Sequence, residues 1–174
     1  MEHQPDRAAA IKKLGELIED IKIAMLTTVE EDGSLRSRPM GTQQVEFDGD
    51  LWFFTAASAP KVGEVQRERQ VNVSYADAGS QRYVSVSGSA QLVRDRPKIE
   101  QLWNPIFRAW FPQGLEDPDL ALLKVSVERA EYWDAPSGKL VQLYGFVKAL
   151  ATGQRPGDEI ADNQKIDLER GRGA

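Results

Sequence analysis

The sequence contains no cysteine and only one histidine, His3, and these two shortages exclude several kinds of protein site. Without cysteine there is no disulfide, no thiolate nucleophile and no cysteine-ligated zinc or iron–sulfur centre. His3 stands in a polar N-terminal stretch, and chain ends of this kind are commonly frayed. We therefore expect neither a metal site nor a Ser-His-Asp triad.

Long apolar runs are also missing, and the charge balance is acidic. No stretch approaches the roughly 20 apolar residues of a membrane-spanning helix, and the start, MEHQPDR, lacks the apolar core of a signal peptide. With 22 basic and 27 acidic residues, the formal net charge is −5. This balance argues against a general nucleic-acid or anionic-membrane binder, so we expect a cytoplasmic protein with neither partner.

The composition is that of a globular protein, with 41% hydrophobic and 28% charged residues in a chain of 174. This length suits one domain with a substantial core. We predict a single domain over residues 1–152 that begins with a helix. Residues 153–174 are polar and rich in Gly and Asp, so we expect an extended strap or tail with Ile166 and Leu168 as its late anchors.

Hydrophobic spacing predicts one long helix followed by strands. Residues 5–20 carry Ile11, Leu14 and Ile18 at helical spacing. Two short helices are predicted, at 58–69 and from Pro97. Strands are predicted at 21–29, 34–47, 51–55, 71–76, 82–93, 120–134 and 139–152. Six or seven short strands at regular spacing favour a mainly β fold, a β-barrel with added helices, over a sandwich or a βαβ sheet.

One predicted strand contains a proline, which cannot donate to a sheet ladder. Pro39 therefore indicates an edge strand or a bulge, and Gly41 two residues later favours the bulge.

Polar residues around the second and third strands have the pattern of a phosphate site. Arg36 and Arg38 are two residues apart and share one face of a strand. Thr55 ends the next strand, Ser58 is a plausible N-cap of the helix that follows, and Lys61 falls in its first turn. A cation there opposes the helix dipole, and a bound anion would explain it. The alternative is that Lys61 simply points into water.

Large aromatic side chains are the second feature. Trp103, Trp110, Phe111 and Trp133 can stack on a planar ring or anchor a subunit interface, or they can fill the core.

Four segments together resemble the pyridoxamine 5′-phosphate oxidase-like flavin-binding split barrels, in particular their general stress protein branch. They are LTTVEEDGSLRSRPM, LWFFTAASAPKVGEV, the stretch around Trp110-Phe111-Pro112, and AEYWDAPSGK, and the resemblance covers roughly residues 7–168. It implies a six- to seven-stranded antiparallel split barrel. It also implies a homodimer that binds FMN in two equivalent clefts at the subunit interface.

The resemblance assigns cofactor contacts residue by residue. The positions that match are Arg38 and Lys61 for the phosphate, Pro39 and Met40 for the backbone along the flavin ring, and Phe54 and Thr55 at the end of the third strand. The family's Ser-Arg-Lys element reads Ala59-Pro60-Lys61 here, and Ser58 can supply the missing hydroxyl. Trp103, Trp110 and Trp133 are candidate covers for the ring.

The substrate half of the family's site departs from the pattern of the vitamin B6 oxidases. Gln43 replaces a substrate-binding lysine, Tyr83 replaces a flavin-binding glutamine, and no histidine after His3 can complete their Arg-x-His motif. We therefore expect a flavin-dependent oxidoreductase of unknown substrate and redox partner, with no catalytic residue named. The alternative is a non-catalytic flavin-binding or flavin-sequestering protein. Pyridoxamine 5′-phosphate oxidation ranks lower, as does a barrel that holds a deazaflavin or haem.

Overall fold

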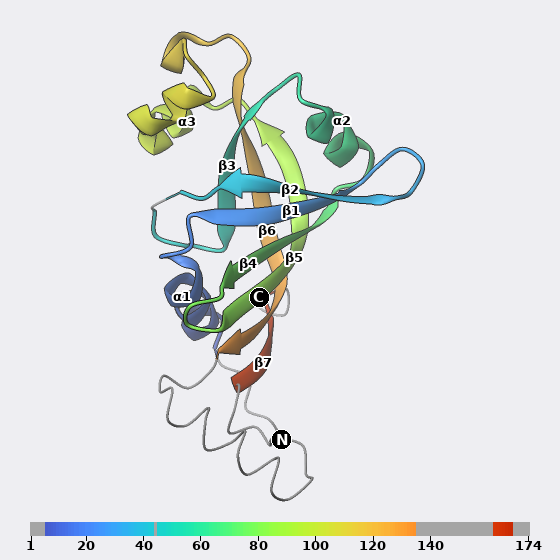
Figure 1. Ribbon diagram of the computed structural model, residues 1–174, viewed down its shortest axis with the longest axis vertical. Helices are drawn as coiled ribbons and strands as arrows, with labels where there is room; N and C mark the ends of the chain where they lie inside the picture. The colour runs from blue at the N-terminus through green and yellow to red at the C-terminus, as the bar shows by residue number, and fades with distance from the viewer. Residues whose placement is uncertain (1–5, 44, 135–161, 169–174) are drawn as a thin grey trace, which may run out of the picture.

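A curled antiparallel sheet forms the body of the protein (Figure 1). The computed structural model describes residues 6–43, 45–134 and 162–168. In these residues the sheet has seven strands in the order β2-β1-β4-β5-β6-β3, with β7 paired to β6. The strands are β1 (Ile23–Val29), β2 (Leu35–Gly41), β3 (Asp50–Ala56), β4 (Gln70–Asp77), β5 (Arg82–Val93), β6 (Leu120–Asp134) and β7 (Asp162–Asp167).

The helices cover the two ends of this sheet. They are α1 (Arg7–Ile18), α2 (Pro60–Arg67) and α3 (Arg96–Leu102), followed by the short 3-10 helices η1 (Pro105–Ala109) and η2 (Gly114–Glu116). Figure 1 shows β1 and β2 running across β5 and β6, with α1 toward one end of the sheet and α2 and α3 toward the other. The predicted mainly β, antiparallel split barrel is confirmed.

The main core lies on the inner face of the curled sheet. Leu26, Val73, Val86 and Val125 are fully buried there, one from each of four strands. Helix α1 closes one end because its apolar residues recur at helical spacing and turn toward the sheet. The buried residues of α1 are Ala10, Leu14, Leu17 and Ile18, which agrees with the predicted amphipathic helix.

A second, smaller core lies between β3, β6 and the segment from α3 to η2. Phe54 of β3 and Leu122 of β6 are buried against Ile99 and Leu102 of α3. Trp103 packs edge-on against Phe54, with ring centroids 5.5 Å apart.

The sequence predicts that the strand with Pro39 is an edge strand and that it carries a bulge, and only the first prediction is correct. β2 stands at the edge of the sheet, as Pro39 indicated, but its pairing with β1 runs without a shift from Leu35 to Gly41. The predicted bulge at Gly41 is therefore wrong. The register shifts instead at Ser87/Gly88, where β5 pairs with β6. β2 also ends at Gly41 rather than near residue 47.

The remaining predictions concern the end of the chain. The strand predicted at 139–152, and the predicted boundary between domain and tail, lie outside the described residues. Strand β7 pairs antiparallel with β6, and both Ile166 within it and Leu168 just after it are buried. Within the part of the chain that the structure describes, no helix has the length and apolar character needed to cross a membrane.

Candidate functional site

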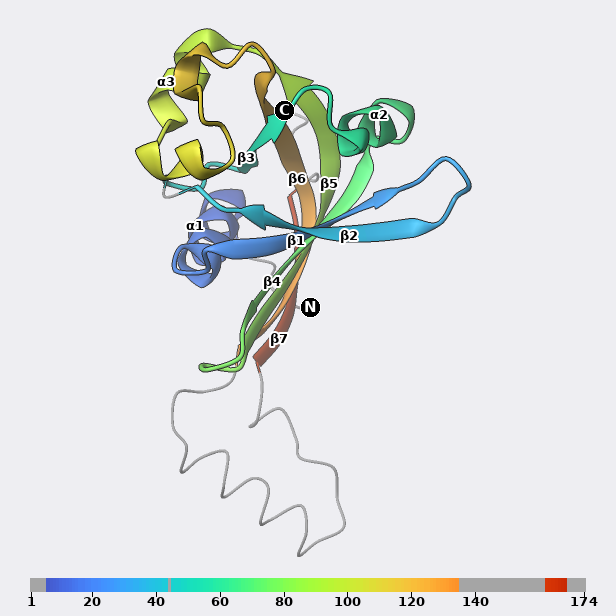
Figure 2. The ribbon, with the colours of Figure 1, turned by 45° about the horizontal axis from the view of Figure 1, so that its top comes forward.

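Helix α2 packs against β1 and β5 (Figure 2). There, side chains from β1, β2 and α2 form a cluster of charged and hydroxyl groups. Leu26 pairs with Arg38 across β1 and β2, so Thr28, two residues from Leu26, lies on the same face as Arg38. From Arg38, Nη1 donates to Thr28 Oγ1 and Nη2 donates to Glu64 Oε2 of α2, each at 2.7 Å. Thr28 Oγ1 in turn donates to the same oxygen of Glu64 at 2.5 Å. The three side chains form a closed ring of hydrogen bonds.

Lys61 completes this cluster from the first turn of α2. Its Nζ donates to Thr55 Oγ1 at 3.3 Å, and Thr55, near the end of β3, is buried. Burial lowers the pKa of the Lys61 ammonium, and the nearby charge of Arg38 lowers it further, while Glu64 acts in the opposite direction. Among the described residues, no carboxylate oxygen lies within 4.0 Å of this nitrogen. We call Arg38, Thr55, Lys61, Glu64 and Thr28 the cradle.

Sequence reasoning missed two members of the cradle, Thr28 and Glu64, and only Glu64 is charged. It stands three residues after Lys61, so the two share a helix face, and this spacing was the available signal. Burial pushes the pKa of Glu64 upward, but the hydrogen bond from Thr28 and the charge of Arg38 outweigh this and hold it below its usual value. Glu64 is therefore ionised at neutral pH. With Arg38 and Lys61 charged, the cradle carries one net positive charge.

The two predicted arginines share a strand face but not a role. The Arg36 side chain is 58% exposed and its Nη1 lies 3.3 Å from Glu30 Oε1, near the β1–β2 turn. Arg38 is the arginine that turns into the cradle.

Ser58 does not cap α2, contrary to the prediction. The N-cap is Ala59, and the helix begins at Pro60. Ser58 instead donates two hydrogen bonds to Asp119: its backbone N–H to Oδ1 at 3.0 Å and its hydroxyl to Oδ2 at 2.5 Å. A role for Ser58 in holding a phosphate stays a prediction.

The other residues assigned by resemblance lie close to the cradle in sequence but differ in exposure. Pro39 is exposed on edge strand β2, whereas Met40 and Phe54 are buried. The Phe54 ring lies 4.9 Å from the Phe107 ring. Met40 and Phe54 can therefore offer a ligand mainly their backbone, as the resemblance implies for Met40.

The structure separates the three candidate tryptophans. Trp103 is a half-buried member of the second core, so its ring serves packing. Trp133 pairs with Tyr83 near the far end of β6. Trp110 is 68% exposed beside η1, and Ile106 one turn earlier is 66% exposed. Of the three, Trp110 has the ring most free to cover a ligand.

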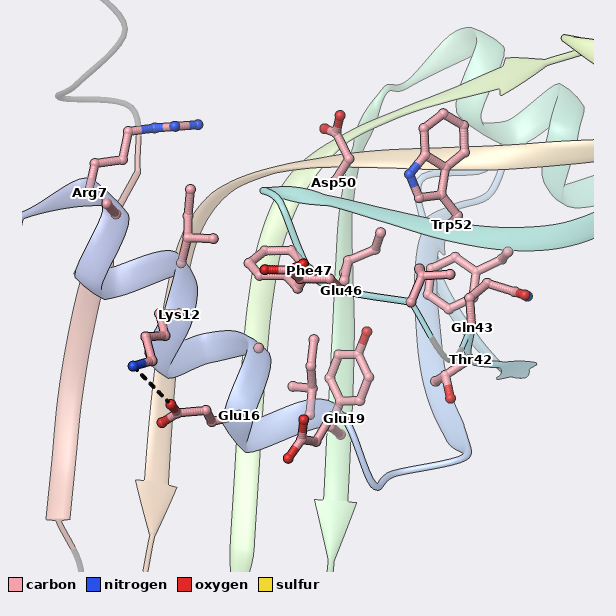
Figure 3. Close-up of a pocket in the computed structure, with 18 of the residues that line it drawn as sticks. Arg7, Lys12, Glu16, Glu19, Thr42, Gln43, Glu46, Phe47, Asp50 and Trp52 are labelled. Carbon is pink, nitrogen blue, oxygen red and sulfur yellow. Dashed lines mark ion pairs between the residues drawn. The ribbon is translucent and has the colours of Figure 1, made fainter. Parts of the chain in front are cut away.

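A separate cavity of about 720 Å³ lies between α1 and the β2–β3 connection (Figure 3). It is near the start of β3, whereas Thr55 is near the end of that strand. Its lining mixes aromatic residues with charges of both signs, including the Lys12–Glu16 ion pair at 4.0 Å. Gln43 also lines it, and the buried Gln43 Nε2 has no partner among the described residues. Because acidic residues outnumber basic ones in this lining, the cavity does not suit an anion.

Comparison with known proteins finds one matching family model and a relative of similar sequence. The family model described as "Pyridoxamine 5′-phosphate oxidase like" matches residues 9–157. Protein bli-3 of Neurospora crassa is 30% identical over 154 residues, which cover 83% of this chain and 74% of that protein.

Two crystal structures illustrate the likeness of fold. A general stress FMN/FAD binding protein from Xanthomonas citri is 28% identical with a TM-score of 0.65, covering 75% of this chain and 92% of that one. A candidate general stress protein 26 from Jannaschia sp. has a TM-score of 0.70 at 24% identity, covering 92% of this chain and 99% of that one. The second likeness concerns the fold alone.

Proposed function

This chain belongs to the pyridoxamine 5′-phosphate oxidase-like family, and on that premise we propose that it binds FMN with the phosphate in the cradle. The observation that carries the proposal is Lys61. Its ammonium is half-buried beside a second cation, Arg38, and has no carboxylate at ion-pair distance in the described residues. In the flavin-free protein the Lys61 ammonium has only the hydrogen bond to Thr55 in place of water, whereas a phosphate would pair with it and accept the remaining N–H groups of Arg38.

The donors present suit a phosphate monoester. Arg38 has five N–H groups, and the hydrogen bonds to Thr28 and Glu64 use two of its nitrogens, so further N–H groups stay available. Lys61 adds an ammonium, whereas the Thr55 hydroxyl already donates to the Ala56 carbonyl oxygen at 3.1 Å and accepts from Lys61, so it orients the ammonium. A monoester carries about −1.5 to −2 charges at pH 7, opposite in sign to the net positive charge of the cradle. The Xanthomonas citri relative, described as an FMN/FAD binding protein, supports a flavin as the ligand.

We further propose that a second copy of this chain completes the site. The outward face of β1 and β2 exposes three apolar side chains, Ile23, Met25 and Leu35. The solvent-facing side of an antiparallel sheet is usually polar, so an apolar patch here indicates a contact surface. We propose that a homodimer buries this face and holds the flavin ring between its subunits. Trp110, exposed just after η1, is then available to cover the ring.

Bound flavin would supply the electron-transfer chemistry, and the protein would orient and tune it. We propose an FMN-dependent oxidoreductase. Within the described residues the cradle holds no group placed as an acid or base at a substrate, so a flavin-sequestering role remains the second candidate. The two differ in turnover: protein reduced with NADPH or dithionite should be reoxidised by oxygen or an added acceptor. A flavin that is bound but never cycles would favour sequestration.

The binding proposal is tested with the purified protein. We expect a yellow protein, or a colourless one that takes up added FMN, and chromatography of the heat-released cofactor should identify FMN rather than FAD. Riboflavin, which lacks the phosphate, should bind at least about tenfold more weakly, since a tenfold difference requires about 1.4 kcal/mol. Protein that takes up no flavin would refute the proposal.

A further inference from the structure

Glu64 places a negative charge inside a site that we assign to a phosphate, and this needs an explanation. Its side chain is 6% exposed, that of Arg38 is 15% exposed, and Thr28 is 1% exposed. A carboxylate in this position repels a phosphate, so its charge alone would weaken binding.

We propose that Glu64 is a positioning residue: with Thr28 it holds the Arg38 guanidinium in the orientation that receives the phosphate, before any flavin arrives. This inference rests on the proposed function, because the phosphate in question is that of FMN. The closed ring of hydrogen bonds carries it. Glu64 Oε2 accepts from Arg38 and from Thr28, and Thr28 Oγ1 also accepts from Arg38.

The ring constrains Arg38 more than a single ion pair would. An arginine side chain has several rotatable bonds, and ordering them on binding costs affinity. Here Nη1 and Nη2 are each held at 2.7 Å by a buried partner. Thr28 lies in a strand and Glu64 in the middle of α2, so both partners stand on regular elements rather than on loops. The ordering cost is met when the protein folds, and phosphate binding does not repeat it.

Two effects of Glu64 on FMN affinity therefore oppose one another. If its charge dominated, every substitution that removes the charge would tighten FMN binding. If positioning dominates, as we propose, Glu64→Ala weakens FMN binding because Arg38 becomes mobile. Glu64→Gln keeps an oxygen that can accept from both Arg38 and Thr28, so it separates the charge from the geometry.

The test compares FMN and riboflavin affinities of wild type, Glu64→Gln and Glu64→Ala by flavin fluorescence titration. We expect Glu64→Ala to weaken FMN about tenfold, equivalent to about 1.4 kcal/mol, with riboflavin changed less than about twofold. Glu64→Gln should stay within about threefold of wild type for FMN. Unchanged or tighter FMN binding by Glu64→Ala would overturn the inference. Equal losses of FMN and riboflavin, not restored in Glu64→Gln, would reduce Glu64 to a structural tether and also overturn it.

A second variant removes one of the two partners that hold Arg38 and leaves the charge of Glu64 in place. In Thr28→Val, valine keeps nearly the shape of threonine but lacks the hydroxyl that accepts from Arg38 and donates to Glu64. We expect it to weaken FMN selectively, whereas a purely electrostatic role for Glu64 predicts no change.

The order of Arg38 can be measured without flavin. In ¹⁵N-labelled protein the Arg38 side-chain N–H signal, assigned with Arg38→Lys, should show restricted guanidinium motion in wild type and Glu64→Gln but not in Glu64→Ala. Equal order in all three would overturn the positioning role. If wild type binds no FMN, the proposed function fails, and this spectrum still decides whether Glu64 holds Arg38.

Discussion

Replacing Lys61 with methionine should have opposite effects on the flavin-free and the flavin-bound protein. Methionine has a similar length and suits a half-buried site. In the flavin-free protein the substitution removes an ammonium whose pKa is lowered, first by burial and second by the charge of Arg38. It gives up only the hydrogen bond to Thr55 Oγ1, which is long at 3.3 Å. We therefore expect the flavin-free variant to be more stable than wild type.

The size of this gain is limited because Lys61 is only half-buried and solvent screens its charge. We expect about 0.5–1 kcal/mol, which corresponds to a rise in melting temperature of about 1–4 °C for a chain of this length. The gain depends on pH in a definite direction. The folded pKa of Lys61 lies below the reference value of 10.5, so the cost of the charged form is present at neutral pH. That cost disappears as the pH rises through the lowered pKa to 10.5, and the advantage of the variant should shrink over the same range.

The same substitution should weaken FMN binding. A charged hydrogen bond to phosphate contributes about 1.5–3 kcal/mol, so the dissociation constant should rise about 10- to 150-fold. Riboflavin should change less than about twofold, because it has no phosphate to lose. In melting experiments at fixed FMN concentration, the stabilisation by FMN should fall by the same 1.5–3 kcal/mol, about the size given by ligand linkage.

The assay is a fluorescence titration with FMN and with riboflavin, joined to thermal unfolding with and without FMN. Lys12→Met is the matched control, because the Lys12 side chain is 80% exposed on α1, away from the cradle. It should leave both affinities unchanged. Equal weakening of FMN and riboflavin, or unchanged FMN binding, would show that Lys61 does not contact the phosphate. A less stable flavin-free variant would refute the argument that Lys61 is an uncompensated cation.

Three further changes test the fold, the proposed interface and the acid response. Gly88→Ala should lower the free energy of unfolding by about 2–3 kcal/mol in denaturant, because a Cβ there would lie 2.4 Å from the Ser126 carbonyl oxygen at the bulge. Gly63→Ala is the control: it has open space around it on α2 and should raise the free energy of unfolding by about 0.5–1 kcal/mol. Met25→Glu puts a charge on the exposed face of β1, so sedimentation velocity should show monomers, and the variant should take up less flavin. An unchanged dimer would exclude that face as the interface. The lowered pKa of Glu64 contributes stability above its reference value of 4.5 that is lost as the pH falls through the folded pKa, so the stability of Glu64→Gln should fall less than that of wild type across this acid range.

Local pattern was enough to predict most elements of the fold. The spacing of Leu14 and Ile18 predicts the helix α1, and both residues are buried on the side that faces the sheet. Alternation of apolar and polar residues predicts β5, in which Val84 and Val86 are buried and Tyr83 is exposed. Patterns of this kind depend on neighbours a few residues apart, and a single sequence displays them directly.

The cradle was predictable only in part. Arg38, Thr55 and Lys61 could be named because residue type and position along a strand or helix indicate an anion site, and the structure brings these three together. That Glu64 is the partner of Arg38 could not be predicted, because the two are 26 residues apart and meet only when α2 packs on β1 and β5.

Competition between distant partners decided the rest. Ser58 has the right chemistry for an N-cap, but Asp119, 61 residues later, takes both its hydroxyl and its N–H. Trp103 and Trp110 lie on one segment, yet only Trp103 packs against Phe54 in the second core, while Trp110 stays exposed. By itself the sequence determined which residues could bind a phosphate and where the strands and helices run, since these depend on residue chemistry and local periodicity. Only the tertiary structure decided which side chain holds which, because hydrogen bonds and burial between distant segments exist only after the chain has folded.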